Sequence, residues 1–116
     1  MKKLFITTYL FLLFSSNVIA ENLSTSSLSG KWTFTHMNLD DTDDRPVNRA
    51  IEFLNDGTVI NYDASGNKKS NASYTIQGNT IVYQDKQGKQ KWLVEKFDKT
   101  NLQVDNRGAM MFFERQ

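Results

Sequence analysis

The sequence predicts an all-β domain, an antiparallel up-and-down barrel of about eight strands that follows a cleaved signal peptide. Two observations and one physical argument lead to this fold class. From Gly30 onward, short runs of alternating apolar and polar residues are separated by turn residues at near-regular intervals. No internal segment keeps a helical period over the dozen residues that a stable helix usually needs. Closing the sheet removes the exposed edges that would invite aggregation.

The first twenty residues have the layout of a secretory signal. Two lysines follow Met1, an apolar run extends from Leu4 to Phe14, and a polar stretch ends at Ala20. The apolar run is too short for a membrane anchor, which needs about 20 residues. We therefore expect a signal peptide at 1–20, a flexible lead-in at 21–29 and a barrel domain at 30–116. The expected location is the bacterial periplasm or the exterior, without stable membrane insertion after cleavage.

The composition excludes disulfide bonds and argues against one class of binding partner. The chain has no Cys, so it forms no disulfide and offers no cysteine for lipid attachment. Loss of Lys2 and Lys3 with the signal reduces Lys plus Arg from 14 to 12, against 13 Asp plus Glu. This balance argues against a nucleic-acid partner.

Eight segments have the strand pattern. Asp56-Gly57 suits a tight hairpin turn between two of them, because Gly accepts positive φ at little cost. Pro46, the only proline, is expected beside an acidic loop and outside any strand. The expected strands cover 31–36, 51–53, 58–62, 72–76, 80–84, 90–97, 102–104 and 109–115.

The Gly30-x-Trp32 pair on the first expected strand, together with Arg115 at the end of the last, resembles the lipocalins and the small bacterial lipocalin-like domains. The phrases IEFLNDGTV, SYTIQGNTIVYQD and KWLVEKFDKTNLQV strengthen the resemblance, which covers nearly all of 30–116. It implies that Trp32 closes one end of the barrel while Arg115 packs across its ring. It also implies binding rather than catalysis.

The expected strand phase fills much of the barrel with aromatic side chains. A barrel of about eight strands is only wide enough for side chains or one small ligand. Either a shallow pocket remains at the open mouth or the core is solid. A small hydrophobic or amphipathic ligand at the mouth is the first hypothesis, with His36, Tyr62, Tyr74 and Tyr83 as candidate contacts. The aromatic side chains expected to point into the barrel are those of Trp32, Phe34, Phe53, Tyr74, Tyr83, Trp92 and Phe113.

A periplasmic protein-binding module, such as an inhibitor or an immunity-type protein, is the alternative. Its recognition surface would combine an acidic loop with the apolar outer face of the last strand at Met110 and Phe112. The apolar residues on that outer face could instead be covered by the lead-in segment or by a neighbouring loop. If the acidic loop has no partner, it is simply a loop exposed to solvent. The spacing of its aspartates does not match that of a calcium-binding loop. Its members are Asp40, Asp41, Asp43 and Asp44.

No catalytic constellation is recognisable. His36 is the only histidine, and one His without Cys makes neither a triad nor a usual zinc site. It falls on the apolar phase of the first strand, where it either belongs to the core or mouth or contacts a ligand. Glu52, Glu95 and Glu114 alternate against the core phase and should face water. We expect a non-enzymatic protein without a cofactor or metal.

Overall fold

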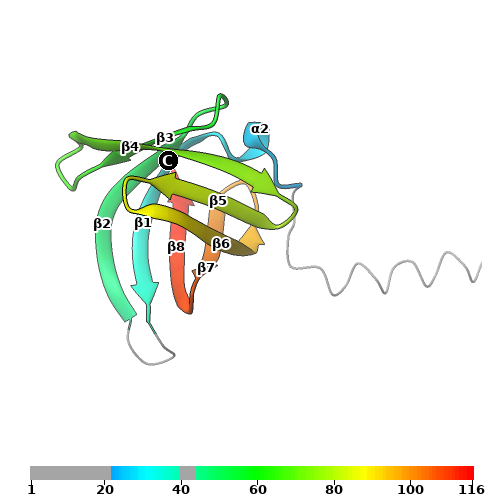
Figure 1. The fold of residues 1–116 in the computed structure, drawn as a ribbon. Helices are drawn as coiled ribbons and strands as arrows, with labels where there is room; N and C mark the ends of the chain where they lie inside the picture. Colours follow the sequence, from blue (N-terminus) through cyan, green and yellow to red (C-terminus); the bar gives the residue numbers. More distant parts are fainter. Residues whose placement is uncertain (1–21, 40–43) are drawn as a thin grey trace, which may run out of the picture.

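The computed structural model describes residues 22–39 and 44–116, which form a closed eight-stranded antiparallel barrel (Figure 1). The predicted signal peptide lies outside the described residues. A short helix, α2 (Thr25–Leu28), precedes the sheet. The strands are β1 (Gly30–Asn38), β2 (Asp44–Phe53), β3 (Thr58–Tyr62), β4 (Lys68–Gln77), β5 (Thr80–Asp85), β6 (Gly88–Phe97), β7 (Asn101–Asn106) and β8 (Ala109–Arg115).

Each strand pairs with its sequence neighbours, and β8 returns to pair with β1. This meander confirms the predicted fold class. Successive hairpins place their turns at alternate ends of the barrel. The turns after β2, β4 and β6 lie at the end near Trp32, which is the closed end, and those after β3, β5 and β7 lie at the other end, which is the mouth.

The lead-in segment differs from the flexible stretch that we expected. Ser24 caps α2 by accepting a hydrogen bond from the Ser27 backbone N–H, and the Ser27 hydroxyl binds the Ser24 backbone N–H in return. Leu28 at the end of this helix is fully buried in the main core. Leu28 and the partly buried Leu23 thus fix the segment over the closed end. Sequence periodicity could not reveal this packing because the helix has only one turn.

The phase of β1 changes at a bulge. The pairing of β1 with both neighbours shifts between Phe34 and His36, so Thr35 is an extra residue in the ladder. Phe34 before the bulge and Met37 after it pack against the core. His36 therefore lies on the outer face of the barrel, which corrects the expectation that it shares the phase of Trp32 and Phe34.

Pro46 lies inside β2, opposite His36, and not outside a strand as expected. The pairing of β2 with β3 begins only at Ala50. Within the described residues, the first half of β2 is therefore not paired with β3, and a residue without a backbone N–H costs no hydrogen bond of that ladder. Pro46 is exposed there, and Asp44 opens the same strand opposite Asn38.

Candidate functional site at the barrel mouth

The closed end is sealed by Arg115 and Trp32. The guanidinium carbon of Arg115 lies 4.3 Å from the Trp32 ring centroid, and its nitrogens donate to the backbone carbonyls of Lys99, Ser29 and Ser27. The fully buried Trp32 donates its indole N–H to the carbonyl of Leu28. This is the arrangement that the resemblance implied.

Gly30 is required at this closure. Its φ is +125°, and a Cβ there would lie 3.0 Å from Nη1 of Arg115. Only glycine combines this backbone conformation with so close an approach. The Gly-x-Trp spacing therefore places Trp32 inside the barrel while leaving room for the arginine that covers it.

A cavity of about 470 Å³ opens toward the mouth. Its size falls within the range of about 300–1,000 Å³ that is usual for small-molecule sites. The closed half of the barrel is instead filled by side chains such as Trp32, Phe53 and Phe97, which are fully buried. The aromatic residues thus fill one half of the barrel and leave the other half hollow. Residues from every strand except β7 line the hollow: Phe34, Arg49, Ala50, Ile51, Asn61, Tyr62, Asp63, Lys69, Ser70, Tyr83, Asp85, Gln90, Trp92, Met111 and Phe113.

Four aromatic rings form a continuous wall of this cavity. The Tyr83 and Trp92 rings stack with centroids 4.8 Å apart, and Trp92 stacks with Phe113 at 6.1 Å. Phe113 then contacts Phe34 at 4.7 Å across the junction of β8 and β1. Such ring contacts stabilise the wall beyond the burial of their area. The wall gives an apolar ligand a firm surface to pack against.

Two small hydrogen-bond networks interrupt the apolar wall. The Gln90 carbonyl Oε1 accepts from the indole N–H of Trp92 at 2.9 Å and from Nδ2 of Asn106 at 3.1 Å. Nδ2 of Asn61 donates to the Tyr83 hydroxyl at 3.0 Å and to the Ser70 hydroxyl at 3.3 Å. A few placed polar groups in an apolar pocket orient a ligand.

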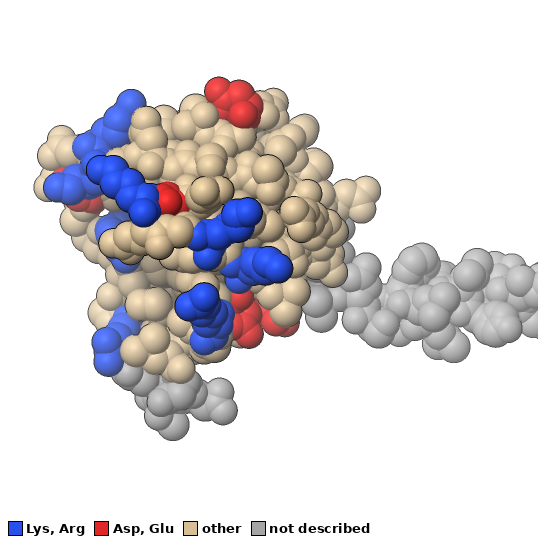
Figure 2. Space-filling model, in the orientation of Figure 1, with Lys and Arg blue, Asp and Glu red and all other residues tan. Residues whose placement is uncertain are grey.

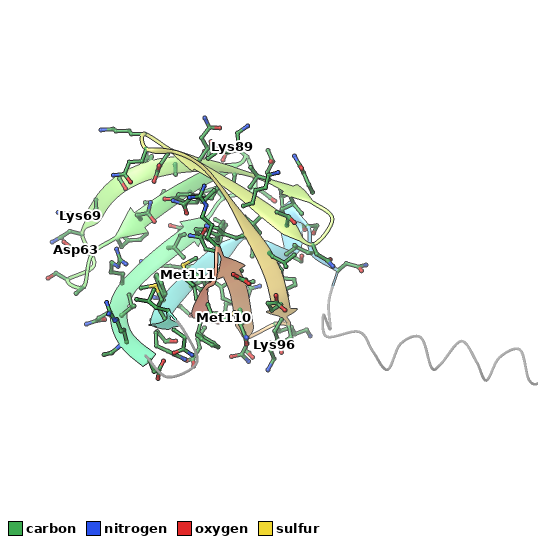
Figure 3. All side chains as sticks on the ribbon, turned by 60° about the horizontal axis from the view of Figure 1, so that its bottom comes forward. Asp63, Lys69, Lys89, Lys96, Met110 and Met111 are labelled. Carbon is green, nitrogen blue, oxygen red and sulfur yellow. The ribbon has the colours of Figure 1, made fainter. Side chains whose placement is uncertain are left out.

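Charged residues of both signs stand at the cavity rim. The Arg49 guanidinium carbon lies 5.5 Å from the Phe34 ring centroid. Lys69 lies beside Asp63 at the end of the β3–β4 hairpin (Figure 3). Backbone N–H groups of Asn67 and Ser65, with help from Lys69, hold the pKa of the Asp63 carboxyl below its ordinary value. Asp85 accepts the backbone N–H of Gln87 in the next mouth turn.

Tyr83 is the predicted ligand contact whose ring forms part of the cavity wall. Burial raises the pKa of its hydroxyl, and the Asp85 charge adds to this rise, while the Asn61 hydrogen bond and the Arg49 charge oppose it. Tyr83 therefore stays a neutral hydrogen-bonding group at ordinary pH. Its contact with a ligand stays a prediction.

Tyr74 lies in the closed half, away from the mouth. Its ring meets Phe53 edge to face at 5.1 Å, and its hydroxyl donates to the Leu54 carbonyl at 2.7 Å. This hydroxyl is thus used to fix the β2–β3 turn. The position makes Tyr74 part of the core rather than of the cavity.

Tyr62 borders the cavity, but its side chain is engaged on the outer face. Its hydroxyl donates to the Glu52 carboxylate at 2.7 Å, and the Lys31 ammonium lies 4.1 Å from the ring centroid. Glu52 and Lys31 each alternate with core residues along their strands, so their side chains point to the outer face. The hydrogen bond with Glu52 raises the pKa of the Tyr62 hydroxyl, with smaller contributions from burial and from the Glu52 charge.

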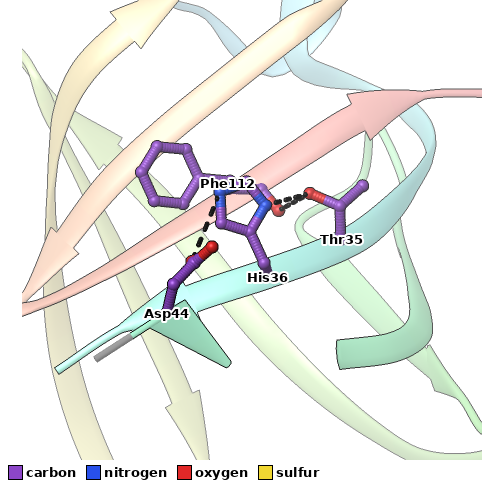
Figure 4. A network of polar contacts seen from close by, with 4 residues as sticks. All are labelled: Thr35, His36, Asp44 and Phe112. Carbon is purple, nitrogen blue, oxygen red and sulfur yellow. Dashed lines mark hydrogen bonds and ion pairs between the residues drawn. The ribbon is translucent and has the colours of Figure 1, made fainter. Parts of the chain in front are cut away.

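His36 belongs to a network outside the barrel (Figure 4). Its ring stacks on Phe112 with centroids 4.1 Å apart and an interplanar angle of 8°. The Thr35 hydroxyl donates to the Phe112 carbonyl, so it accepts its 3.0 Å hydrogen bond from Nδ1–H of His36. Nε2 lies 3.8 Å from a carboxylate oxygen of Asp44. The structure thus places His36 and Asp44 together, but not at the cavity.

The surface suggested for a protein partner is only partly described. Met110 and Phe112 lie on the outer face of β8 and are half-buried. The stacked His36 ring covers part of Phe112. From the sequence, we expected the lead-in or a neighbouring loop to provide this cover. Asp40, Asp41 and Asp43 lie outside the described residues.

Arg49, Asn61 and Gln90 were missed as site residues. Each is polar and lies two positions from an inward apolar residue, namely Ile51, Val59 and Trp92. A polar residue in the inward phase near the mouth end of a strand is the signal that could have found them. Within 22–39 and 44–116, no three His, Asp or Glu side chains gather as a metal site would require. No helix in this part of the chain is long and apolar enough to cross a membrane.

Neither a scan of protein-family models nor a search of curated proteins finds a match. Solved structures do match. An uncharacterized protein from Bacteroides eggerthii superposes with a TM-score of 0.66 at 14% identity, covering 77% of this chain and 99% of its own. A lipocalin-like protein from Bacteroides uniformis gives a TM-score of 0.64 at 20% identity, covering 78% and 99%. The chain therefore has the fold of a lipocalin-like β-barrel.

Proposed function

We propose that this protein is an exported, non-catalytic binding protein that holds one small hydrophobic or amphipathic molecule in the cavity at the barrel mouth. The cavity carries the proposal. It combines a volume suited to a small molecule with an aromatic wall and a few polar groups. The aromatic surface would bind the apolar body of the ligand, and the polar groups would orient it.

A barrel filled with side chains would favour the alternative, a protein-binding module, because it would leave no room for a small ligand. The mouth half of the barrel is hollow, so that reason no longer applies. An inhibitor or immunity-type protein would use the outer face of β8 and the connection between β1 and β2. A ligand in the cavity and a protein on this outer face would respond to different substitutions.

Titration of the mature protein, residues 21–116, with the neutral fluorophore N-phenyl-1-naphthylamine tests the proposal. We expect saturable one-to-one binding. Ser70→Tyr should weaken the binding of the fluorophore about tenfold or more, because Ser70 lines the cavity and a tyrosine ring would occupy the ligand's space. Ser73→Tyr is the matched control, since Ser73 is exposed on the outer phase of the same strand.

Equal binding by both variants would contradict the proposed location. Absence of binding by the unchanged protein, to this probe and to a panel of fatty acids and small aromatics, would contradict the proposed function. Capture of an exported protein by the outer face of β8, lost on Phe112→Ala, would then favour the alternative. Unchanged far-ultraviolet circular dichroism of each variant would show that the barrel remains folded.

A further inference from the structure

We propose that the ligand carries an acidic group, a carboxylate or a similar oxyanion, and that Arg49, Gln90 and Tyr83 bind this group while the apolar body packs on the aromatic wall. This inference rests on the proposed function and adds the chemical class of the ligand. Its basis is the set of hydrogen-bond donors at the cavity that no other group in the described part of the chain uses.

The orientation of the Gln90 amide is fixed by its neighbours. The indole N–H of Trp92 can only donate, so the amide atom facing it must be the oxygen. The same oxygen accepts Nδ2 of Asn106. Both hydrogens of the Gln90 Nε2 group are therefore unused by any residue in 22–39 and 44–116. They suit a ligand that brings acceptors.

The Tyr83 hydroxyl is a second unused donor. Its oxygen accepts a hydrogen bond from Asn61, and within the described residues its own hydrogen has no acceptor. Tyr83 and Gln90 come from β5 and β6 and lie opposite each other in the ladder. A single oxyanion has enough lone pairs to accept from both side chains.

Arg49 supplies the charge. It lines the cavity against Phe34 and forms no ion pair with a carboxylate in the part of the chain that the structure describes. Its charge reaches the Tyr83 hydroxyl, where it favours the ionised form. A guanidinium with its donors free is well suited to bind a carboxylate through two hydrogen bonds.

Two carboxylates at the rim oppose an anion, but each is committed to a turn. Asp63 accepts the backbone N–H groups of Ser65 and Asn67 and lies near the Lys69 charge. Asp85 accepts the backbone N–H of Gln87. Lys and Arg side chains also gather on the side of the molecule where the β3–β4 and β5–β6 hairpins end (Figure 2). Within 22–39 and 44–116, the charge of Arg49 has no carboxylate partner, and its guanidinium lies over the Phe34 ring.

Three probes with one naphthalene body test the inference: 2-naphthoate, methyl 2-naphthoate and 2-naphthylmethylammonium. Their head groups carry a negative charge, none and a positive charge. Calorimetric titration at pH 7 should rank the carboxylate first, about tenfold tighter than the ester, as expected for one charge-assisted hydrogen-bonded pair. The ammonium probe should bind no better than the ester.

Arg49→Met should remove the advantage of 2-naphthoate and leave ester binding unchanged. Lys31→Met is the matched control, because Lys31 also covers an aromatic ring but does so on the outer face. Gln90→Glu keeps an acceptor for Trp92 and Asn106 while replacing the free donor by an acceptor. It should weaken 2-naphthoate at least as strongly as Arg49→Met.

Failure of the acidic-ligand inference and failure of the proposed function give different results. If ester and carboxylate bind equally and Arg49→Met changes neither, the acidic head group is wrong while binding at the mouth stands. If no probe binds, and the neutral fluorophore and ligand panel described above do not bind either, both proposals fail. If the carboxylate advantage persists in Arg49→Met and disappears in Lys31→Met, the anion is bound on the outer face, which overturns the assignment to the cavity.

Discussion

The guanidinium carbon of Arg115 lies 4.3 Å from the centroid of the Trp32 ring, and this contact joins the last strand to the first across the closed end. The same guanidinium binds three backbone carbonyls that precede β1 or follow β6. Arg115 therefore connects α2, the β6–β7 turn and the core in one side chain. One side chain thus holds the closed end together.

Removing this connection should destabilise the barrel. We expect Arg115→Met to lower the free energy of unfolding by about 2–3 kcal/mol, because three carbonyls lose a charged donor. Arg115→Lys keeps the charge but not the planar fork of donors, so it should restore less than half of the loss. Urea unfolding followed by Trp emission measures both. Full stability of the lysine variant would show that charge alone suffices.

Gly30 and Gly88 form a matched pair for testing the close approach of Arg115. Their φ angles are +125° and +130°, but a Cβ at Gly88 would meet nothing within 4 Å. Alanine at either position bears the cost of positive φ, about 1 kcal/mol or more. Gly30→Ala should cost about 1–3 kcal/mol beyond Gly88→Ala, because it also displaces the guanidinium. Equal losses in chemical unfolding would refute crowding as the reason for Gly30.

Tyr74 should make the barrel sensitive to alkali. Burial, and secondarily the charge of Asp56, raises the pKa of its hydroxyl above the ordinary value of 10.0. The folded state therefore holds this proton more tightly than the unfolded state. The resulting stabilisation is complete below pH 10 and declines as pH rises from 10 through the folded pKa, by up to about 1.4 kcal/mol per pH unit.

Tyr74→Phe should make the stability curve less steep above pH 10. The variant also loses the hydrogen bond to Leu54, which lowers stability by a constant of about 1 kcal/mol at lower pH. The slope between pH 9 and 11, taken from urea unfolding at each pH, is thus the relevant quantity. An unchanged slope would mean that Tyr74 does not contribute to the alkaline loss.

Export should be accompanied by cleavage after Ala20. We expect the protein recovered from a periplasmic fraction to begin at Glu21, because Ala20 is a small residue of the kind that precedes a cleavage site. Mass spectrometry of the recovered chain checks this. Ala20→Lys should leave the uncleaved chain with the membrane fraction, whereas Asn17→Lys, away from the cleavage positions, should be processed. An intact chain in the cytoplasm would contradict the proposed export.

The sequence by itself determined the number and order of the strands and their closure, but not the start of β2, which lies at Asp44 and not at Ile51. Alternation of apolar and polar residues requires only the two-residue period of a strand, and the turn residues mark where each strand ends. The pairing of Trp32 with Arg115 was implied by the resemblance to the lipocalin-like domains, and the meander brings their two strands side by side. These features are local or follow from a simple meander.

Only the tertiary structure decided where the open space lies and which side chains reach it. The bulge at Thr35 turns His36 outward because one extra residue reverses the phase of a strand, and no alternation pattern reports such an insertion. Leu28 is buried by contacts with distant strands, which a one-turn helix does not encode. The cavity depends on how far each ring extends along the barrel axis, and this is a property of packing. The inward phase of Arg49, Asn61 and Gln90 could be predicted from the sequence, but only the structure shows that the three side chains border one cavity.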